Sequence, residues 1–383
     1  MNGLSYIGRL TGALLLAASL CGCRGGAPGY GEVAGTEIPL HYAAGFRITE
    51  CEGYTAVSLR DPWDTLRTRR LYLLVDRESS LPDNLPEGIL VRTPVQKAAI
   101  YTTTVASLLE QMGCLGNICG ICETEYVTSK EALGLVEIGA IVDLGSSTSP
   151  NIEKIVEMET EAIIASPFEN SSYGAAEKIG VPIIEAADYM ERHPLGRAEW
   201  IRFFSRLFGR QAEGDSLFSR TERRYNALKQ LAGTAERKPT VMLERRYGGQ
   251  WPMPAGDNYV GTLHRDAGAD YLFSELKGSG SVPLPFETVL ERAVDADYWL
   301  IKYNSISPLT YGDLASDYPP YKSFKAFQNH SVYACNTGVT TYYDDISLHP
   351  DLILADFIHI YHPELLPDHI PVYYFPLKTD EEN

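Results

Sequence analysis

The cysteines and histidines are the side chains that could do chemistry in this sequence, and their spacing defines no reaction centre. Cys119-Gly-Ile-Cys122 has the spacing of a zinc-binding or redox pair, but no second such pair completes a zinc site. Among the eight histidines, only His359 and His362 lie close together, at the end of an expected helix. Motifs of metalloproteases, serine hydrolases, nucleotide-binding loops and calcium loops are absent. We therefore predict no catalytic residue and no metal site.

Two points about these residues stay open. Past residue 23 five cysteines follow, an odd number, and we interpret them as buried free thiols, with a single disulfide as the alternative. His193 lies in a polar turn that follows an expected strand. It could reach a cleft and serve as a haem ligand.

The first 37 residues are expected to export and tether the chain. Residues 1–22 contain one basic residue and an apolar run, Thr11–Leu20, that is shorter than the about 20 residues needed to span a bilayer. This pattern is typical of a secretory signal peptide. It ends in Leu-Cys-Gly-Cys23, which resembles a bacterial lipobox, and we predict that Cys23 is acylated; an ordinary cleaved signal with incidental cysteines is the alternative. Residues 23–37 are Gly-rich and predict a flexible tether, which places the protein in the cell envelope, facing the periplasm.

The length and charge of the chain limit its class. With 383 residues, of which 44% are hydrophobic, it exceeds one core of ordinary size, and two domains are expected. The net charge is −17, whereas a nucleic-acid-binding surface needs clustered positive charge. We therefore exclude nucleic acid as a partner.

The hydrophobic rhythm predicts an α/β fold with two lobes. Residues 38–94 alternate apolar and polar positions, which favours antiparallel strands or hairpins. Short apolar runs then alternate with helical patterns, once before residue 190 and again after Pro239, and this alternation is typical of parallel α/β layers. The expected units are an N-terminal α/β lobe with added β strands (38–210), a linking helix (211–236) and a C-terminal α/β lobe (237–383).

The linking helix is expected to be stiff. Its apolar stripe comprises Leu217, Thr221, Tyr225, Leu228 and Leu231, which have amphipathic spacing. A continuous helix has no loop to absorb large dihedral changes. The two lobes should therefore hold a ligand in a cleft between them with only small motion.

Aromatic and polar residues gather where the expected strands end, which is where open α/β sheets bind ligands. Aromatic walls there suit a large, flat, partly apolar ligand, and arginines could hold carboxylate or catecholate groups. The predicted ligand-binding residues are Tyr101, Thr102, Tyr126, Phe168, Arg192, Arg245, Arg246, Tyr247, Trp251, Tyr303, Tyr342 and Tyr343.

Several segments resemble one family. The chain is similar, over roughly residues 90–375, to the substrate-binding lipoproteins of ABC transporters for iron complexes and cobalamin. The resemblance implies two Rossmann-like lobes bridged by a backbone helix, no enzyme activity, and delivery of ligand to a membrane permease and its ATPase. The strands in 38–76 look like an addition to the family pattern. The matching segments are the lipobox and residues 101–113, 150–155, 161–165, 194–200, 251–259 and 349–356.

The resemblance also implies docking residues and a ligand class. Family members dock on the permease through one surface glutamate in each lobe, and Glu153 and Glu287 occupy the matching positions. Each lies near a helix start, where a carboxylate is favoured in any case. The expected ligand is a metal chelate: a ferric siderophore, cobalamin or haem. The alternatives are an envelope α/β enzyme with a metal cofactor, and a binding lipoprotein without a permease.

Overall fold

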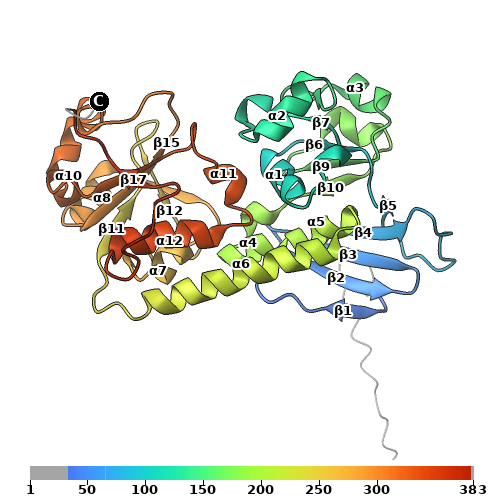
Figure 1. Ribbon diagram of the computed structural model, residues 1–383, viewed down its shortest axis with the longest axis horizontal. Coiled ribbons are helices and arrows are strands. Elements are labelled where there is room, and N and C mark those ends of the chain that lie inside the picture. Colours follow the sequence, from blue (N-terminus) through green and yellow to red (C-terminus); the bar gives the residue numbers. More distant parts are fainter. Residues whose placement is uncertain (1–32, 65, 381–383) are drawn as a thin grey trace, which may run out of the picture.

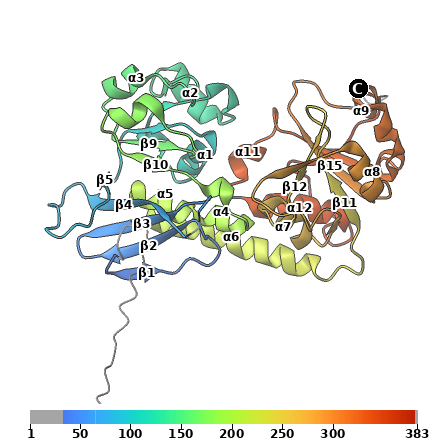
Figure 2. The ribbon, with the colours of Figure 1, turned by 180° about the vertical axis from the view of Figure 1, so that it is seen from behind.

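The protein consists of two α/β lobes that are bridged by one long helix. The computed structural model describes residues 33–64 and 66–380. Figure 1 shows the lobes side by side, with helix α6 (Gln211–Ala232) running beneath both, and Figure 2 shows the same arrangement from behind. The predicted fold class is thus confirmed. The predicted signal peptide and Cys23 lie outside the described residues.

The N-terminal lobe contains a five-stranded parallel sheet of order β10-β9-β6-β7-β8. Its central strands β6 and β9 are short runs of alanine and isoleucine that are buried throughout, as expected of a sheet covered on both faces. Helix α2 was not predicted; Ser129 caps it by accepting a hydrogen bond from the amide of Ala132 at 3.0 Å. The elements are β6 (Ala98–Ile100), α1 (Thr103–Gln111), β7 (Ile118–Ile121), α2 (Lys130–Glu137), β8 (Val142–Asp143), α3 (Ile152–Glu157), β9 (Ala162–Ala165) and β10 (Ile183–Glu185).

The C-terminal lobe repeats this plan with a sheet of order β13-β11-β15-β16-β17, in which only β17 is antiparallel. A separate two-stranded antiparallel sheet of β12 and β14 was not predicted. The elements are β11 (Thr240–Leu243), β12 (Trp251–Pro254), α7 (Tyr259–Asp266), β13 (Asp270–Tyr271), β14 (Ser281–Leu284), α8 (Phe286–Ala293), β15 (Tyr298–Tyr303), α9 (Tyr311–Asp317), α10 (Lys325–Gln328), β16 (Val332–Asn336), α11 (Tyr342–Asp345), α12 (Pro350–Tyr361) and β17 (Phe375–Pro376).

The added N-terminal strands form a sheet of their own, of order β1-β2-β3-β4-β5. It is antiparallel except between β4 and β5, which are parallel. Its inner face shares one hydrophobic core with the N-terminal lobe: the Phe46 ring lies 4.9 Å from that of Trp200, and Tyr72 stacks on Phe203 at 5.8 Å. The strands are β1 (Thr36–Ile38), β2 (Phe46–Cys51), β3 (Tyr54–Arg60), β4 (Thr68–Asp76) and β5 (Ile89–Thr93).

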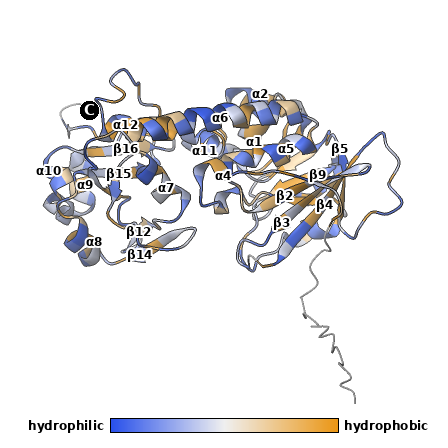
Figure 3. Cartoon of the chain, turned by 90° about the horizontal axis from the view of Figure 1, so that it is seen from below, coloured by the Kyte–Doolittle hydropathy of each residue, from blue (hydrophilic) through white to orange (hydrophobic). Residues whose placement is uncertain are grey.

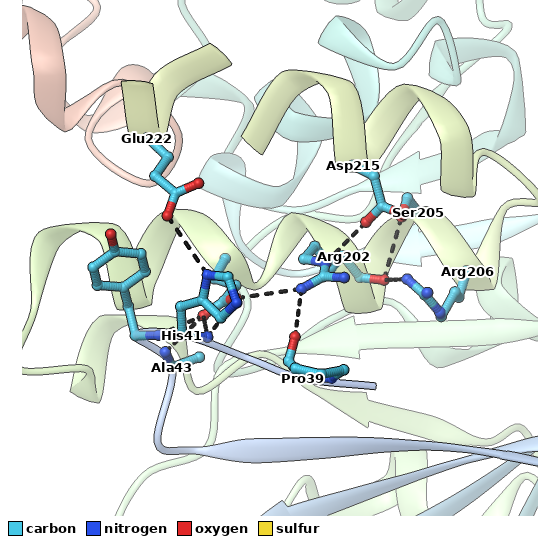
Figure 4. A network of polar contacts seen from close by, with 10 residues as sticks. Pro39, His41, Ala43, Arg202, Ser205, Arg206, Asp215 and Glu222 are labelled. Atoms are coloured by element: carbon cyan, nitrogen blue, oxygen red, sulfur yellow. Dashed lines mark hydrogen bonds and ion pairs between the residues drawn. The ribbon is translucent and has the colours of Figure 1, made fainter. Parts of the chain in front are cut away.

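Two buried carboxylates fasten this sheet to the lobe beside helix α4 (Pro194–Glu199). The Glu199 carboxylate accepts hydrogen bonds from three consecutive backbone amides, those of residues 41–43, at 2.8–2.9 Å. Glu191 accepts hydrogen bonds from the next two amides, those of residues 44 and 45, at 3.0 and 2.8 Å. We call residues 41–45 the clasp. Around it, Arg202 donates to the carbonyl of Pro39 at 2.8 Å, and Glu222 lies 3.6 Å from the His41 ring (Figure 4).

The linking region is two helices, α5 (Ile201–Leu207) and α6, which cross closely at Gly214. A Cβ on Gly214 would lie 2.4 Å from the side chain of Ser205, so only glycine permits this approach. Of the predicted stripe, Thr221 and Tyr225 are buried, whereas the three leucines are only half-buried. Figure 3 shows hydrophobic and hydrophilic residues intermixed along α6.

A buried histidine in α7 makes the stability of the fold sensitive to acid. His264 stacks on Phe357 at 4.2 Å, its Nδ1 lies 2.8 Å from the Tyr361 hydroxyl, and burial lowers its pKa to about 3. The unfolded chain binds this proton near pH 6.5. The contribution of the neutral His264 ring to stability is therefore fully present above pH 6.5 and is lost as the pH falls towards 3.

From pH 7 to pH 5, we expect His264 to cost about 2 kcal/mol of unfolding free energy, since each pKa unit is worth about 1.4 kcal/mol. Urea unfolding at the two pH values measures the loss. The variant His264→Gln should lose correspondingly less over the same interval, because it has no imidazole to protonate. Equal losses in both proteins would contradict this prediction.

Candidate functional site: a cavity between the lobes

A cavity of about 1200 Å³ lies between the two lobes. Its walls come from segments that follow the carboxyl ends of parallel strands in both sheets, the usual position of ligands in α/β folds. The volume slightly exceeds the range of about 300–1,000 Å³ that is usual for small-molecule sites, which indicates a bulky ligand.

The N-terminal lobe supplies most of the wall. Residues 101–104 follow β6, residues 123–128 follow β7, residues 147–150 follow β8, and residues 166–175 follow β9. Serine and threonine form the largest group among them, accompanied by the aromatic rings of Tyr101, Tyr126, Phe168 and Tyr173. This wall therefore offers hydroxyl groups and aromatic faces together.

The C-terminal lobe supplies the facing wall from fewer segments. Asn304 follows β15, residues 337–340 follow β16, and Tyr343 and Asp344 belong to the short helix α11. Tyr343, Phe168 and Tyr126 are 51–60% exposed although their rings are large and apolar. Exposed rings gathered around one hollow are typical of a binding surface.

Direct contacts hold the lobes together beside the cavity. The Thr128 hydroxyl donates a hydrogen bond to the Asp344 carboxylate, and His349 Nε2 lies 2.7 Å from Gln111 Oε1. Deeper in the protein, Ser347 donates to Asp188 at 3.0 Å. These contacts and α6 connect the two walls.

The ionisable groups of the cavity have distinct environments. Hydrogen bonds from Ser147 lower the pKa of Glu123, whose Oε1 accepts from the Ser147 amide and hydroxyl at 2.7 Å each. Burial raises the pKa of Asp344. The hydrogen bond from Thr128 lowers this pKa, but the effect of burial is larger. Burial also raises the pKa of Tyr101 well above its ordinary value. The phenol of Tyr101 is therefore neutral, and the Glu123 carboxyl is ionised.

The structure brings five of the predicted ligand-binding residues together in this cavity. They come from four different segments of both lobes, and each follows a strand, as the sequence suggested. These residues are Tyr101, Thr102, Tyr126, Phe168 and Tyr343.

For Trp251 and Tyr342 the prediction is wrong, because both side chains belong to the core of the C-terminal lobe. Trp251 is fully buried, contacts Trp299 at 5.7 Å, and donates its indole N–H to the carbonyl of Leu243 at 2.8 Å. Tyr342 is 2% exposed and packs edge-on against Tyr373 at 5.7 Å. Both rings stabilise the lobe and leave no face free for a ligand.

The three predicted arginines do not line the cavity. Arg192 and Arg245 each form a surface ion pair, with Asp257 at 3.3 Å and with Asp317 at 3.1 Å. The Arg246 guanidinium lies over a tyrosine ring at 4.0 Å. The expected clamp for an anionic ligand is therefore not formed.

Tyr247 and Tyr303 also lie elsewhere. Tyr247 is 85% exposed in the turn before β12. Tyr303 accepts a hydrogen bond from the amide of Leu309 at 3.2 Å and lines a second, smaller hollow of about 260 Å³.

The histidine and cysteine residues that were candidates for a ligand or metal site have structural roles. His193 caps α4 by accepting a hydrogen bond from the Leu195 amide at 3.1 Å, and its ring stacks on Tyr42 at 5.0 Å, outside the cavity. The five described cysteines are free thiols, and burial raises the pKa of Cys122 to about 12. Within residues 33–64 and 66–380, no group of His, Cys, Asp and Glu residues could hold a metal ion.

Sequence reasoning missed three segments of the lining: residues 147–150, 171–175 and 337–339. The first follows β8 and reads Ser-Thr-Ser-Pro, a polar run directly after a short apolar one. The rule that ligands bind after strands would have found it. The other two segments follow β9 and β16 and obey the same rule.

A pair of α/β lobes that encloses a ligand-sized cavity is typical of solute-binding proteins. The family model described as periplasmic binding protein matches residues 99–337. The chain belongs to this periplasmic binding protein family, as the sequence resemblance predicted. In the described residues, no helix is long and apolar enough to cross a bilayer.

The individual proteins that resemble this chain have low sequence identity to it. An uncharacterized lipoprotein of Methanocaldococcus jannaschii is 28% identical over 313 residues, which are 78% of this chain and 73% of that protein. An ABC-type Fe3+-hydroxamate transport protein of Saccharomonospora viridis is similar in structure, with a TM-score of 0.54 and 14% identity over 74% of this chain and 96% of that one. The S. aureus IsdE protein, solved with haem, has a TM-score of 0.54 and 13% identity over 70% of this chain and 98% of its own.

Proposed function

We propose that this protein is the receptor of an ABC importer, which captures a bulky metal chelate such as a ferric siderophore or cobalamin. The observation that carries the proposal is the cavity of about 1200 Å³ between two fixed lobes, lined by hydroxyl groups and exposed aromatic rings. Such walls bury the flat, apolar faces of a chelate and hydrogen-bond its polar edges. The similar structures of an Fe3+-hydroxamate transport system and of the haem complex of IsdE support this ligand class.

Membrane attachment and permease docking complete the proposal. Acylation at Cys23 would hold the receptor at the membrane surface, and the lipoprotein relative supports this. Glu153 in α3 and Glu287 in α8 would contact basic residues of the permease. Each is exposed, each is the second residue of its helix, and neither has an ion-pair partner among the described residues.

The test is the absorbance spectrum of protein isolated from its host, followed by titration of the colourless protein. Ferric siderophore, corrin and haem chromophores have different spectra, so one measurement identifies a bound chelate. Titration with each class, followed by tyrosine and tryptophan fluorescence, should give saturable binding of at least one. Turnover of the bound molecule would instead favour an envelope enzyme. Tight binding without a co-purifying permease would favour a binding lipoprotein that acts alone.

The variant Tyr101→Phe is expected to separate ligand binding from folding. The Tyr101 hydroxyl is buried and has no hydrogen-bond partner in the protein, so its removal should leave the unfolding free energy within about 0.5 kcal/mol of the wild type. Affinity for the chelate should fall about tenfold, because a lost hydrogen bond in a buried site is worth about 1–1.5 kcal/mol. Urea unfolding and fluorescence titration measure the two quantities. Unchanged affinity would contradict the role of this hydroxyl.

A further inference from the structure

All charged groups that line the cavity have the same sign. They are Glu123, Glu125 and Asp344, and no Lys, Arg or His is among the described residues of the lining. The basic residues behind the walls already have partners: Lys302 is paired with Glu244, and Arg69 and Arg70 are paired with the fully buried carboxylate of Glu185. A ligand therefore meets negative charge without a compensating cation.

The Glu123 carboxylate is ionised at neutral pH, because hydrogen bonds lower its pKa. Glu123 accepts hydrogen bonds from Ser146 and Ser147, which lower its pKa, and Glu125 is exposed at the edge of the cavity. Burial raises the pKa of Asp344, so this carboxyl takes up a proton more readily than Glu123 does, and a bound ligand can change its charge. An anion placed here would lose water and gain no ionic partner, at a high cost in free energy.

A second, independent observation concerns hydrogen bonds to the ligand. The Tyr101 side chain is only 6% exposed, lines the cavity, and its hydroxyl has no hydrogen-bond partner; the Tyr173 hydroxyl, also in the lining, has none either. Buried hydroxyls without a partner are rare in native proteins because they cost free energy. Burial raises the pKa of both phenols, so they remain neutral donors. Each is therefore a hydrogen-bond donor without a protein partner, on a residue that lines the cavity.

We infer that the cavity selects a chelate that is uncharged or carries net positive charge and that presents oxygen acceptors, as a ferric trihydroxamate does. Anionic chelates, such as a ferric tris-catecholate or haem with its two propionates, are discriminated against. This inference rests on the proposed function and narrows its ligand class.

The test uses one linear trihydroxamate, loaded with Fe3+, in three forms. Its terminal amine is left free (one positive charge), acetylated (uncharged) or succinylated (one negative charge), so that metal coordination stays the same. For the full-length chain at low salt, we expect affinity to fall about tenfold from the cationic to the anionic form. The difference should be smaller at high salt, because salt screens charges that are partly exposed. A ferric tris-catecholate should bind more weakly still.

Variants identify the source of the preference. In Glu123→Gln combined with Glu125→Gln, affinities for the three forms should converge to within about threefold, because the remaining difference comes from Asp344 alone. Glu131→Gln, on the exposed surface of α2, is the matched control and should keep the wild-type order. If the anionic form binds the wild type as tightly as the cationic form, the charge inference is wrong and the proposed function stands. If no chelate of any charge binds, the proposed function is wrong as well.

Discussion

Replacement of Glu199 by alanine is expected to lower the unfolding free energy by about 3 kcal/mol. The carboxylate is fully buried and accepts hydrogen bonds from the amides of His41, Tyr42 and Ala43 at 2.8–2.9 Å. Its removal leaves these amides without an acceptor inside the protein, and each unsatisfied buried donor costs about 1–3 kcal/mol, reduced where water can enter. Because the clasp joins β1 to β2, the N-terminal sheet should also become sensitive to proteases. Urea unfolding and limited proteolysis measure both effects.

Glu222→Ala is the matched control, since Glu222 lies beside the same residue, His41 (Figure 4). Its contact of 3.6 Å joins partly exposed side chains, and such pairs contribute about 0–1 kcal/mol. Glu199→Gln should be intermediate, because its amide oxygen still accepts hydrogen bonds. Equal stability of Glu199→Ala and Glu222→Ala would show that the clasp does not hold the sheet.

The clasp also connects the added sheet to the junction between the lobes. Helix α4, which ends at Glu199, contains Arg197, whose Nε donates to Asp188 at 2.9 Å and to Ser347 of the other lobe at 3.2 Å. The same short helix therefore contacts the N-terminal sheet and the junction between the lobes.

The sequence predicted the strands and the part of the cavity that follows from them. Runs such as Ala162-Ile-Ile-Ala165 are short, have no amphipathic pattern and are bounded by polar residues, which favours buried strands. The carboxyl ends of parallel strands meet at one edge of a sheet. Tyr101, Tyr126 and Phe168 could therefore be assigned to one wall from their positions after β6, β7 and β9.

The wrong assignments within residues 245–251 share one physical cause. Residues 245–251 also follow a strand, but a turn at Gly248 and Gly249, both with positive φ, returns the chain into β12. β12 pairs with β14, about thirty residues later along the chain, and this pairing turns Trp251 into the core. Local patterns do not determine such distant pairing. For the same reason they do not indicate that Glu199, an ordinary helical glutamate by sequence, is buried against residues 41–43.

Charge reversal at both proposed docking residues is expected to reduce transport by more than tenfold while chelate affinity stays unchanged. Glu153→Arg with Glu287→Arg would place two cations against the basic permease residues that the proposal requires, and like charges brought together at an interface cost several kcal/mol. Both residues are outside the cavity lining, so ligand affinity should be unaffected. Uptake of radioactive iron chelate into cells or vesicles, and titration of the purified variant, measure the two quantities separately.

The matched control is Glu52→Arg with Glu236→Arg. These glutamates are exposed, lie in the β2–β3 turn and after α6, and change the net charge by the same amount. A general electrostatic effect on the membrane encounter would lower transport equally in both double variants, whereas docking through α3 and α8 lowers it only in the first. Added salt separates the two explanations further. It screens a general, long-range electrostatic effect, because such interactions are weak beyond a Debye length of about 8 Å at physiological ionic strength. Full transport by the Glu153→Arg, Glu287→Arg protein would remove both residues from the permease interface and leave the chelate-binding role of the cavity intact.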